Sequence, residues 1–184
     1  DSPVRNVVSW NAVISGYTLG GQSHEALKCF VQMQKEGLTP DEITITCVLK
    51  ACGSIGAIDK GKQINDEILR TGFLGKGIAI GTALVDMYAN CGLLNEAWVV
   101  FDHKLPFPNV VPWTTLISGF AFQGDINNVF HLLEIMLYEG IEADEITLLS
   151  ILTVCSHVGL VEFGCEYFQV LTKDYRIDPT IEHH

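Results

Sequence analysis

The residues most able to do chemistry in this chain are its cysteines and histidines, because thiolates and imidazoles bind metals and act as nucleophiles or bases. The 184 residues contain six of each. No two cysteines stand in a CxxC spacing, and no histidine begins the HxE pattern that zinc deaminases combine with CxxC. There is no phosphate-binding glycine loop and no nucleophile elbow. We therefore expect no catalysis, no metal, no cofactor and no small-molecule substrate in this chain.

Composition excludes further classes. The cysteines sit inside apolar helical patterns, which favours free thiols in a reducing compartment over disulfides. No run of eighteen uncharged apolar residues occurs, so we expect no membrane span. The start, "DSPVRN", is not a signal or transit peptide. The net charge of −11 argues against general adhesion to polyanions. The six cysteines are Cys29, Cys47, Cys52, Cys91, Cys155 and Cys165.

The chain repeats itself at an offset of 103 residues. "VVSWNAVISGY" at 7–17 returns as "VVPWTTLISGF" at 110–120. "DEITITCVLKAC" at 41–52 returns as "DEITLLSILTVC" at 144–155. Self-similarity at a fixed period is the signature of a repeat architecture, so the shorter units within this period have to be identified.

Each shorter unit reads as a helical hairpin. In the first unit, apolar residues at helical spacing mark one helix face: Trp10, Val13, Ile14 and Tyr17. Gly20 and Gly21 break this helix, and Ser23 can cap the next one. Gly37 closes the second helix, and Asp41 opens the following hairpin.

Three hairpins of unequal length make up the period of 103. We expect hairpins at 7–41, 42–77 and 78–109, then at 110–144 and 145–184. Because one hairpin cannot bury its apolar face alone, stacking predicts an all-α, right-handed α-solenoid of about five repeats, with the first helices on the concave surface. Trp10, Trp98 and Trp113 are predicted to be core residues.

Hairpins of 35, 36 and 32 residues resemble the P, L and S motifs of plant pentatricopeptide repeat proteins. The strings "EALKCFVQM", "GLTPDEITITCVLKACGSIGAIDKGKQI" and "GTALVDMYANCG" carry this resemblance. It implies P-type repeats at 7–41 and 110–144, L-type repeats at 42–77 and 145–184, and an S-type repeat at 78–109. Residues 1–6 resemble the tail of a preceding S-type repeat, and 145–184 the last L-type repeat before a C-terminal extension that this fragment lacks.

The resemblance implies binding of single-stranded RNA in a mitochondrion or chloroplast, one base per repeat. The family reads bases with the fifth and last residues of each hairpin and stacks them between side chains at the second position. The second-position residues are Val8, Ile43, Ala79, Val111 and Ile146. The base-reading pairs are Asn11 with Asp41, Thr46 with Gly77, Thr82 with Asn109, and Thr114 with Asp144.

Hydrogen-bonding capacity accounts for half of this code. An ionised Asp only accepts, which favours uracil or guanine, whereas an Asn amide also donates and accommodates adenine or cytosine. In the family, Thr at the fifth position pairs with purines and Asn with pyrimidines. The resemblance therefore implies the order 5′-U-N-A-G-3′, in which N is unread because Gly77 has no side chain. Helix capping is the alternative role of Asp41, Asn109 and Asp144, since each directly precedes a helix start.

The implied role is the recognition segment of a factor for C-to-U RNA editing. Its partners would be organellar RNA, accessory editing factors, and a deaminase-bearing protein or domain outside this chain. A protein-interaction scaffold, or a role in RNA splicing or stability, are the alternatives. Where the family often places lysine near phosphates, this chain has Leu19, Asn90 and Phe122, so we expect the fragment alone to bind RNA weakly.

Overall fold

A computed structural model describes residues 6–72, 78–104 and 109–160, together with 162, 164–166 and 169. The described residues are helical and contain no strand. The predicted fold class, an all-α array of helical hairpins, is confirmed. The chain divides into two compact units, residues 1–106 and 107–184.

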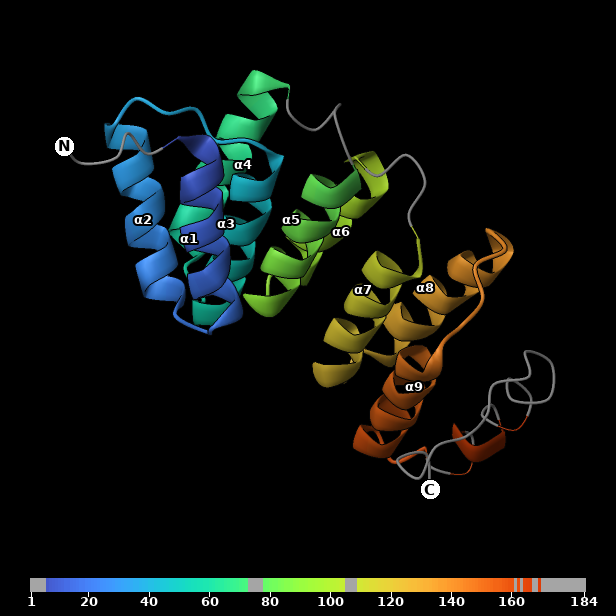
Figure 1. Ribbon diagram of the computed structural model, residues 1–184. Coiled ribbons are helices and arrows are strands. Elements are labelled where there is room, and N and C mark those ends of the chain that lie inside the picture. The colour runs from blue at the N-terminus through green and yellow to red at the C-terminus, as the bar shows by residue number, and fades with distance from the viewer. Residues whose placement is uncertain are drawn as a thin grey trace. The chain divides into compact units, whose positions relative to one another are not determined.

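The first unit is built from helices that alternate between two layers (Figure 1). Central α3 packs against the first helix of the hairpin on either side and also against α2. α4 packs on α3 and α5, and α6 packs on α5. The helices are α1 (Val7–Leu19), α2 (Ser23–Lys35), α3 (Glu42–Ile55), α4 (Ile58–Thr71), α5 (Ile78–Asn90) and α6 (Leu94–Lys104).

The second unit contains α7 (Val110–Phe122), α8 (Ile126–Tyr138) and α9 (Glu145–His157). α7 packs against both α8 and α9, so the start of a hairpin stack is repeated here. Within the described residues, no helix has the length and apolar character that crossing a bilayer requires.

The tight turns between paired helices depend on glycine. In α1–α2 the turn places Gly21 at φ 71°, a left-handed conformation that other residues adopt only with strain. The amide of Gln22 then donates to the carbonyl of Tyr17 at 2.8 Å, which satisfies an orphan carbonyl at the helix end. Gly124 in α7–α8 has φ 76°, and Asp125 donates to Phe120 at 3.0 Å in the same way.

The core confirms some of the predicted apolar positions and corrects others. Trp10 and Trp113 are each only 2% exposed, as predicted for core residues. Trp98 is half-buried and stacks on Phe101 with a centroid separation of 5.5 Å, so its assignment to the core was only partly right. Val13, which was expected on the buried face of α1, is 40% exposed.

Ser23 also differs from its expected role. It is the first residue of α2 and not its cap, because the capping position falls on Gln22, which forms no side-chain capping bond. The Ser23 hydroxyl is buried and hydrogen-bonds instead to the Ser54 hydroxyl of α3, at 2.6 Å between the two oxygens. A contact between hairpins thus replaces the local cap that the sequence suggested.

Candidate nucleic-acid interface

The predicted base-reading residues Asn11 and Asp41 meet at the junction between the first two hairpins. The Asn11 Nδ2 donates to both carboxylate oxygens of Asp41, at 2.9 Å and 2.8 Å. The Asn11 Oδ1 accepts from the Thr44 hydroxyl, and that hydroxyl also contacts Asp41 Oδ1 at 2.9 Å. Asn11 is 7% exposed. The fifth residue of one hairpin and its last residue therefore form one polar cluster with the start of the next.

Asp41 also caps the N-terminus of α3, which is the alternative role expected from the sequence. Its Oδ1 accepts from the backbone amide of Thr44 at 2.9 Å, and its own amide donates to the Thr44 hydroxyl at 3.3 Å. Partial burial raises the pKa of Asp41, but hydrogen bonds from Thr44, Asn11 and the Ile43 amide outweigh it, so the pKa lies below its ordinary value of 3.8. The carboxylate is therefore ionised near neutral pH and can only accept hydrogen bonds.

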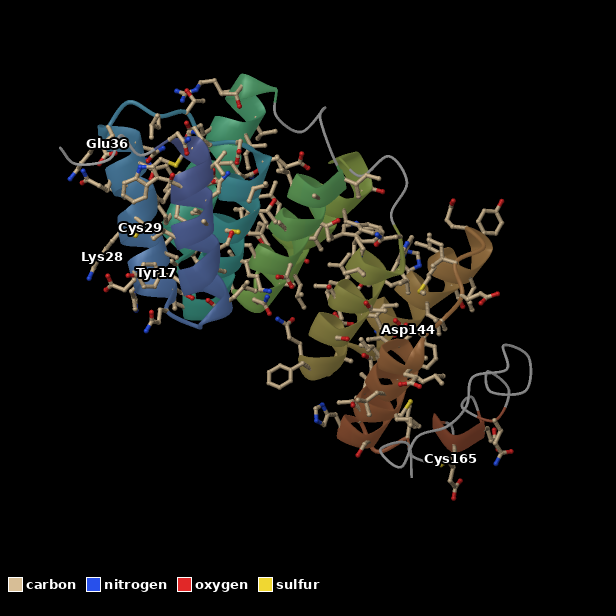
Figure 2. The ribbon with its side chains drawn as sticks, viewed as in Figure 1. Tyr17, Lys28, Cys29, Glu36, Asp144 and Cys165 are labelled. Atoms are coloured by element: carbon tan, nitrogen blue, oxygen red, sulfur yellow. The ribbon has the colours of Figure 1, made fainter. Side chains whose placement is uncertain are left out.

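The corresponding pair in the second unit is arranged differently. Asp144, labelled in Figure 2, caps α9 by accepting from the Thr147 amide at 2.9 Å and from its hydroxyl at 2.8 Å. Thr114 is 5% exposed, but its hydroxyl donates to the Val111 carbonyl of its own helix at 2.9 Å. The carboxylate at this junction is thus held by α9, whereas the Thr114 hydroxyl is bonded within α7.

Asn109 is the third predicted base reader at the end of a hairpin. Its side-chain oxygen caps α7 by accepting from the Val111 amide at 3.1 Å, and the residue is exposed. The more usual capping partner, one residue further on, is Pro112, which has no amide hydrogen. The Asn109 NH2 group donates to none of the described residues, so it can donate to a ligand.

The remaining predicted readers make local contacts. Thr46 and Thr82 are half-buried, and each hydroxyl donates to the carbonyl four residues earlier, Glu42 at 2.8 Å and Ile78 at 3.0 Å. Gly77 lies outside the described residues. These threonines present a methyl group and a hydroxyl oxygen that can still accept.

The five predicted base-stacking positions are all exposed in the first turns of first helices. Val8 is 73% exposed, Ile43 57%, Ile146 55% and Val111 50%, and Ala79 is also exposed. In each unit, an exposed aliphatic side chain therefore recurs at the second residue of successive first helices. Val8, Ile43 and Ala79 lie in the first unit, whereas Val111 and Ile146 lie in the second.

Cations are sparse near these positions. Leu19 and Phe122 are 79% and 83% exposed, and Asn90 is exposed, at the three places where lysine was expected from the family pattern. Burial raises the pKa of Asp86 on α5. The positive charge of Lys50, an exposed residue of α3, partly offsets this rise. From residue 105 to residue 172 the sequence has no lysine or arginine.

Sequence reasoning missed the residues that hold the predicted readers in place. Thr44 and Thr147 are completely buried, and Pro112 is buried. The signal was present in the strings "DEIT" at 41–44 and 144–147, because a capping residue followed three positions later by a hydrogen-bonding side chain is the pattern of a capping box.

Comparison with protein families and curated relatives shows which known proteins this chain resembles. The model described as the PPR repeat family matches residues 5–54 and 108–157, and the PPR repeat model matches 82–103. The chain is 39% identical over 182 residues to the chloroplastic pentatricopeptide repeat-containing protein DOT4 of Arabidopsis thaliana, covering 98% of this chain and 21% of that protein. It is 37% identical over 177 residues to a mitochondrial pentatricopeptide repeat-containing protein of the same plant, covering 96% and 19%. The chain thus spans about a fifth of the length of these relatives.

Solved structures show the same fold. Maize PPR10 in complex with an 18-nt psaJ RNA element matches with a TM-score of 0.76 at 18% identity, over 91% of this chain and 25% of that chain. The PPR domain of Arabidopsis thaliana protein-only RNase P 1 in complex with tRNA matches with a TM-score of 0.73 at 14% identity, over 96% and 94%. Family models, relatives and fold agree, and the chain belongs to the pentatricopeptide repeat family.

Proposed function

We propose that this chain binds single-stranded RNA, one base per hairpin, in the order 5′-U-N-A-G-3′. The observation that carries the proposal is the cluster of Asn11 and Asp41 at a hairpin junction, next to the exposed aliphatic side chains of Val8 and Ile43. A base could stack on such side chains while its Watson–Crick edge meets the polar pair. Two proteins of similar fold, PPR10 and the RNase P 1 domain, were solved with RNA, which supports the same ligand class.

The hydrogen-bonding groups fit the proposed bases. The Asp41 carboxylate accepts hydrogen bonds, so it favours the ring N–H of uracil. Asn11 occupies the fifth position, where the family pairs asparagine with pyrimidines. Asp144 accepts in the same way from guanine, next to Thr114. Asn109 keeps a free NH2 group that can donate to the bare ring nitrogen of adenine.

The larger role that we propose is recognition within an organellar C-to-U RNA-editing factor. Relatives named chloroplastic and mitochondrial support an organellar location. The deaminase would then be a separate domain or partner, and accessory editing factors would bind the same assembly.

A protein-interaction scaffold is the second candidate, and one observation favours it. Residues 107–172 of the second unit contain no lysine or arginine, so phosphate neutralisation there is weak. We therefore expect this chain alone to bind RNA in the micromolar range or weaker at physiological salt.

Base preference of the full 184-residue chain decides between these candidates. Fluorescence anisotropy at low ionic strength would compare short RNAs that differ at one base of the proposed sequence. We expect preference for uracil, adenine and guanine at the first, third and fourth positions, and none at the second. Equal binding of all four bases at the three read positions would contradict RNA recognition and favour the scaffold.

A further inference from the structure

A hydroxyl group stands at the third residue of a hairpin wherever the preceding hairpin ends in a well-held polar side chain. Ser9 donates to Asn6 Oδ1 through its amide at 2.9 Å and its hydroxyl at 3.0 Å. Thr147 makes the same two contacts with Asp144, at 2.9 Å and 2.8 Å. At Asp41 the Thr44 amide and hydroxyl both lie 2.9 Å from Oδ1, and the single hydroxyl proton is shared between that oxygen and the Asn11 Oδ1. The arrangement therefore recurs at three junctions of the chain.

In both aspartates the contacts from the third residue fall on a single carboxylate oxygen. Thr44 and Thr147 contact Oδ1 with both amide and hydroxyl, so Oδ1 is committed to the helix. At Asp144 no contact from the third residue reaches Oδ2, and at Asp41 the side chain that donates to Oδ2 is Asn11, not Thr44. A carboxylate oxygen accepts two hydrogen bonds, so Oδ2 retains the capacity to accept from a base.

We propose that the third residue of the following hairpin is a positioning residue for base reading, a role that rests on the proposed function. Its hydroxyl fixes one oxygen of the reader as a helix cap and turns the second oxygen toward the base. Capping and reading are then two uses of one side chain, divided between its two oxygens. At the Asp41 and Asp144 junctions, the two reading residues are thereby supported by a third residue, which belongs to the next hairpin.

The junction at Asn109 provides an internal contrast. Pro112 occupies the third position, where it offers neither an amide hydrogen nor a hydroxyl. Among the described residues, Asn109 accepts from the Val111 amide alone, at 3.1 Å, and its side chain is exposed. With one contact in place of two, its amide group is less firmly oriented. We therefore expect adenine to be the least strongly discriminated of the three read bases.

The test uses the full chain and replaces hydroxyls by methyl groups of equal size. Thr44→Val removes the hydroxyl from a fully buried site and keeps the packing, whereas Thr44→Ser keeps the hydroxyl. Thr71→Val is the matched control, because the Thr71 hydroxyl donates only within α4, to Glu67 at 2.8 Å and Ile68 at 3.3 Å. For each variant, the ratio of affinities for RNAs with uracil or cytosine at the first position would be measured together with Tm.

We expect Thr44→Val to reduce the uracil-to-cytosine ratio roughly threefold to tenfold, the range of one hydrogen bond, with Thr44→Ser and Thr71→Val close to the unmodified chain. A full ratio in Thr44→Val, or a lost ratio that Thr44→Ser does not restore, would overturn the positioning role. If the unmodified chain itself showed no base preference, the proposed function would fail instead.

A gain of discrimination provides the complementary measurement. Pro112→Thr restores an amide hydrogen and a hydroxyl at the third position, and we expect it to raise the preference for adenine over guanine at the third base by roughly threefold. An unchanged ratio in a folded Pro112→Thr variant would show that the third residue does not orient the reader.

Discussion

The α1–α2 and α7–α8 hairpins begin with a repeated string, "VVSWNAVISGY" and "VVPWTTLISGF", 103 residues apart, yet their junctions are bonded differently. In the first, the Asn11 amide spans the gap to the next hairpin and holds both oxygens of Asp41. In the second, the Thr114 hydroxyl bonds within α7, and Asp144 is held by α9. The two fifth residues thus bond differently: Asn11 contacts the start of the next hairpin, whereas Thr114 bonds within its own helix. In the first hairpin, Asn11 therefore joins consecutive hairpins in addition to its proposed role in base choice.

The largest effect should appear when each aspartate is truncated. Asp41→Ala removes a helix cap and leaves the buried Asn11 amide without its acceptor, so we expect a loss of about 2 to 4 kcal/mol in unfolding free energy. Asp144→Ala removes only a cap and should cost about 1 kcal/mol. Urea unfolding of the full chain, followed by circular dichroism, measures both. Equal losses would show that the Asn11 bridge contributes nothing.

The next effect is a change of base at the second junction. Asp144→Asn converts an acceptor-only side chain into one that also donates, while its Oδ1 can still cap α9. We expect preference at the fourth base to move from guanine toward adenine by about tenfold or more, since a good base contact is worth about 1–3 kcal/mol. RNA titrations that vary only this base measure the change. If guanine and adenine weaken equally, Asp144 is a cap and not a reader.

Exchanging the fifth residues of the two hairpins should exchange the bases that the hairpins prefer. Asn11→Thr removes the bridge to Asp41, and the base preferred at the first position should move from uracil toward guanine by roughly fivefold. Thr114→Asn should move the fourth base from guanine toward uracil to a similar extent. The reciprocal pair is its own control, because each variant carries the residue that the other hairpin has naturally. A loss of affinity without exchange of preference would contradict reading by the fifth residue.

The sequence was sufficient to predict the helical hairpins but not the face that each helix buries. The turn glycines and the apolar spacing are local signals, so the fold class followed directly from them. On α1, however, Asn11 and Thr18 are buried while Val13 is exposed. Periodicity assigns apolar residues to the interior, whereas here polar residues face the next hairpin and find partners there. Thr18, for example, contacts the Cys47 carbonyl of α3 at 3.4 Å, in addition to the Ile14 carbonyl of its own helix at 2.9 Å.

The sequence predicted where the residues of the candidate interface lie, but not the hydrogen bonds that connect them. The resemblance placed the pairs at residues that lie at the junctions, as Asn11 and Asp41 show. The supporting hydroxyl of Thr44 could not be read in the same way, because its partner in the preceding hairpin is 33 residues away in sequence. Contacts of this kind depend on how hairpins stack, which a single hairpin does not encode.

The smallest predicted effect concerns pH and isolates the Asn11 bridge. Because hydrogen bonds hold the folded pKa of Asp41 below 3.8, its ionised form stabilises the fold above the unfolded pKa, and this contribution is lost as pH falls through the folded value. Asp41→Asn keeps the shape and a capping oxygen but cannot titrate. The difference in urea midpoint between the unmodified chain and Asp41→Asn should therefore shrink as pH falls below 3.8. In an Asn11→Thr background one of the hydrogen bonds that lower the pKa is absent, so the same loss should begin at higher pH. Identical pH profiles in the two backgrounds would show that Asn11 does not stabilise the ionised carboxylate, and the difference between the two hairpins would then be one of packing alone.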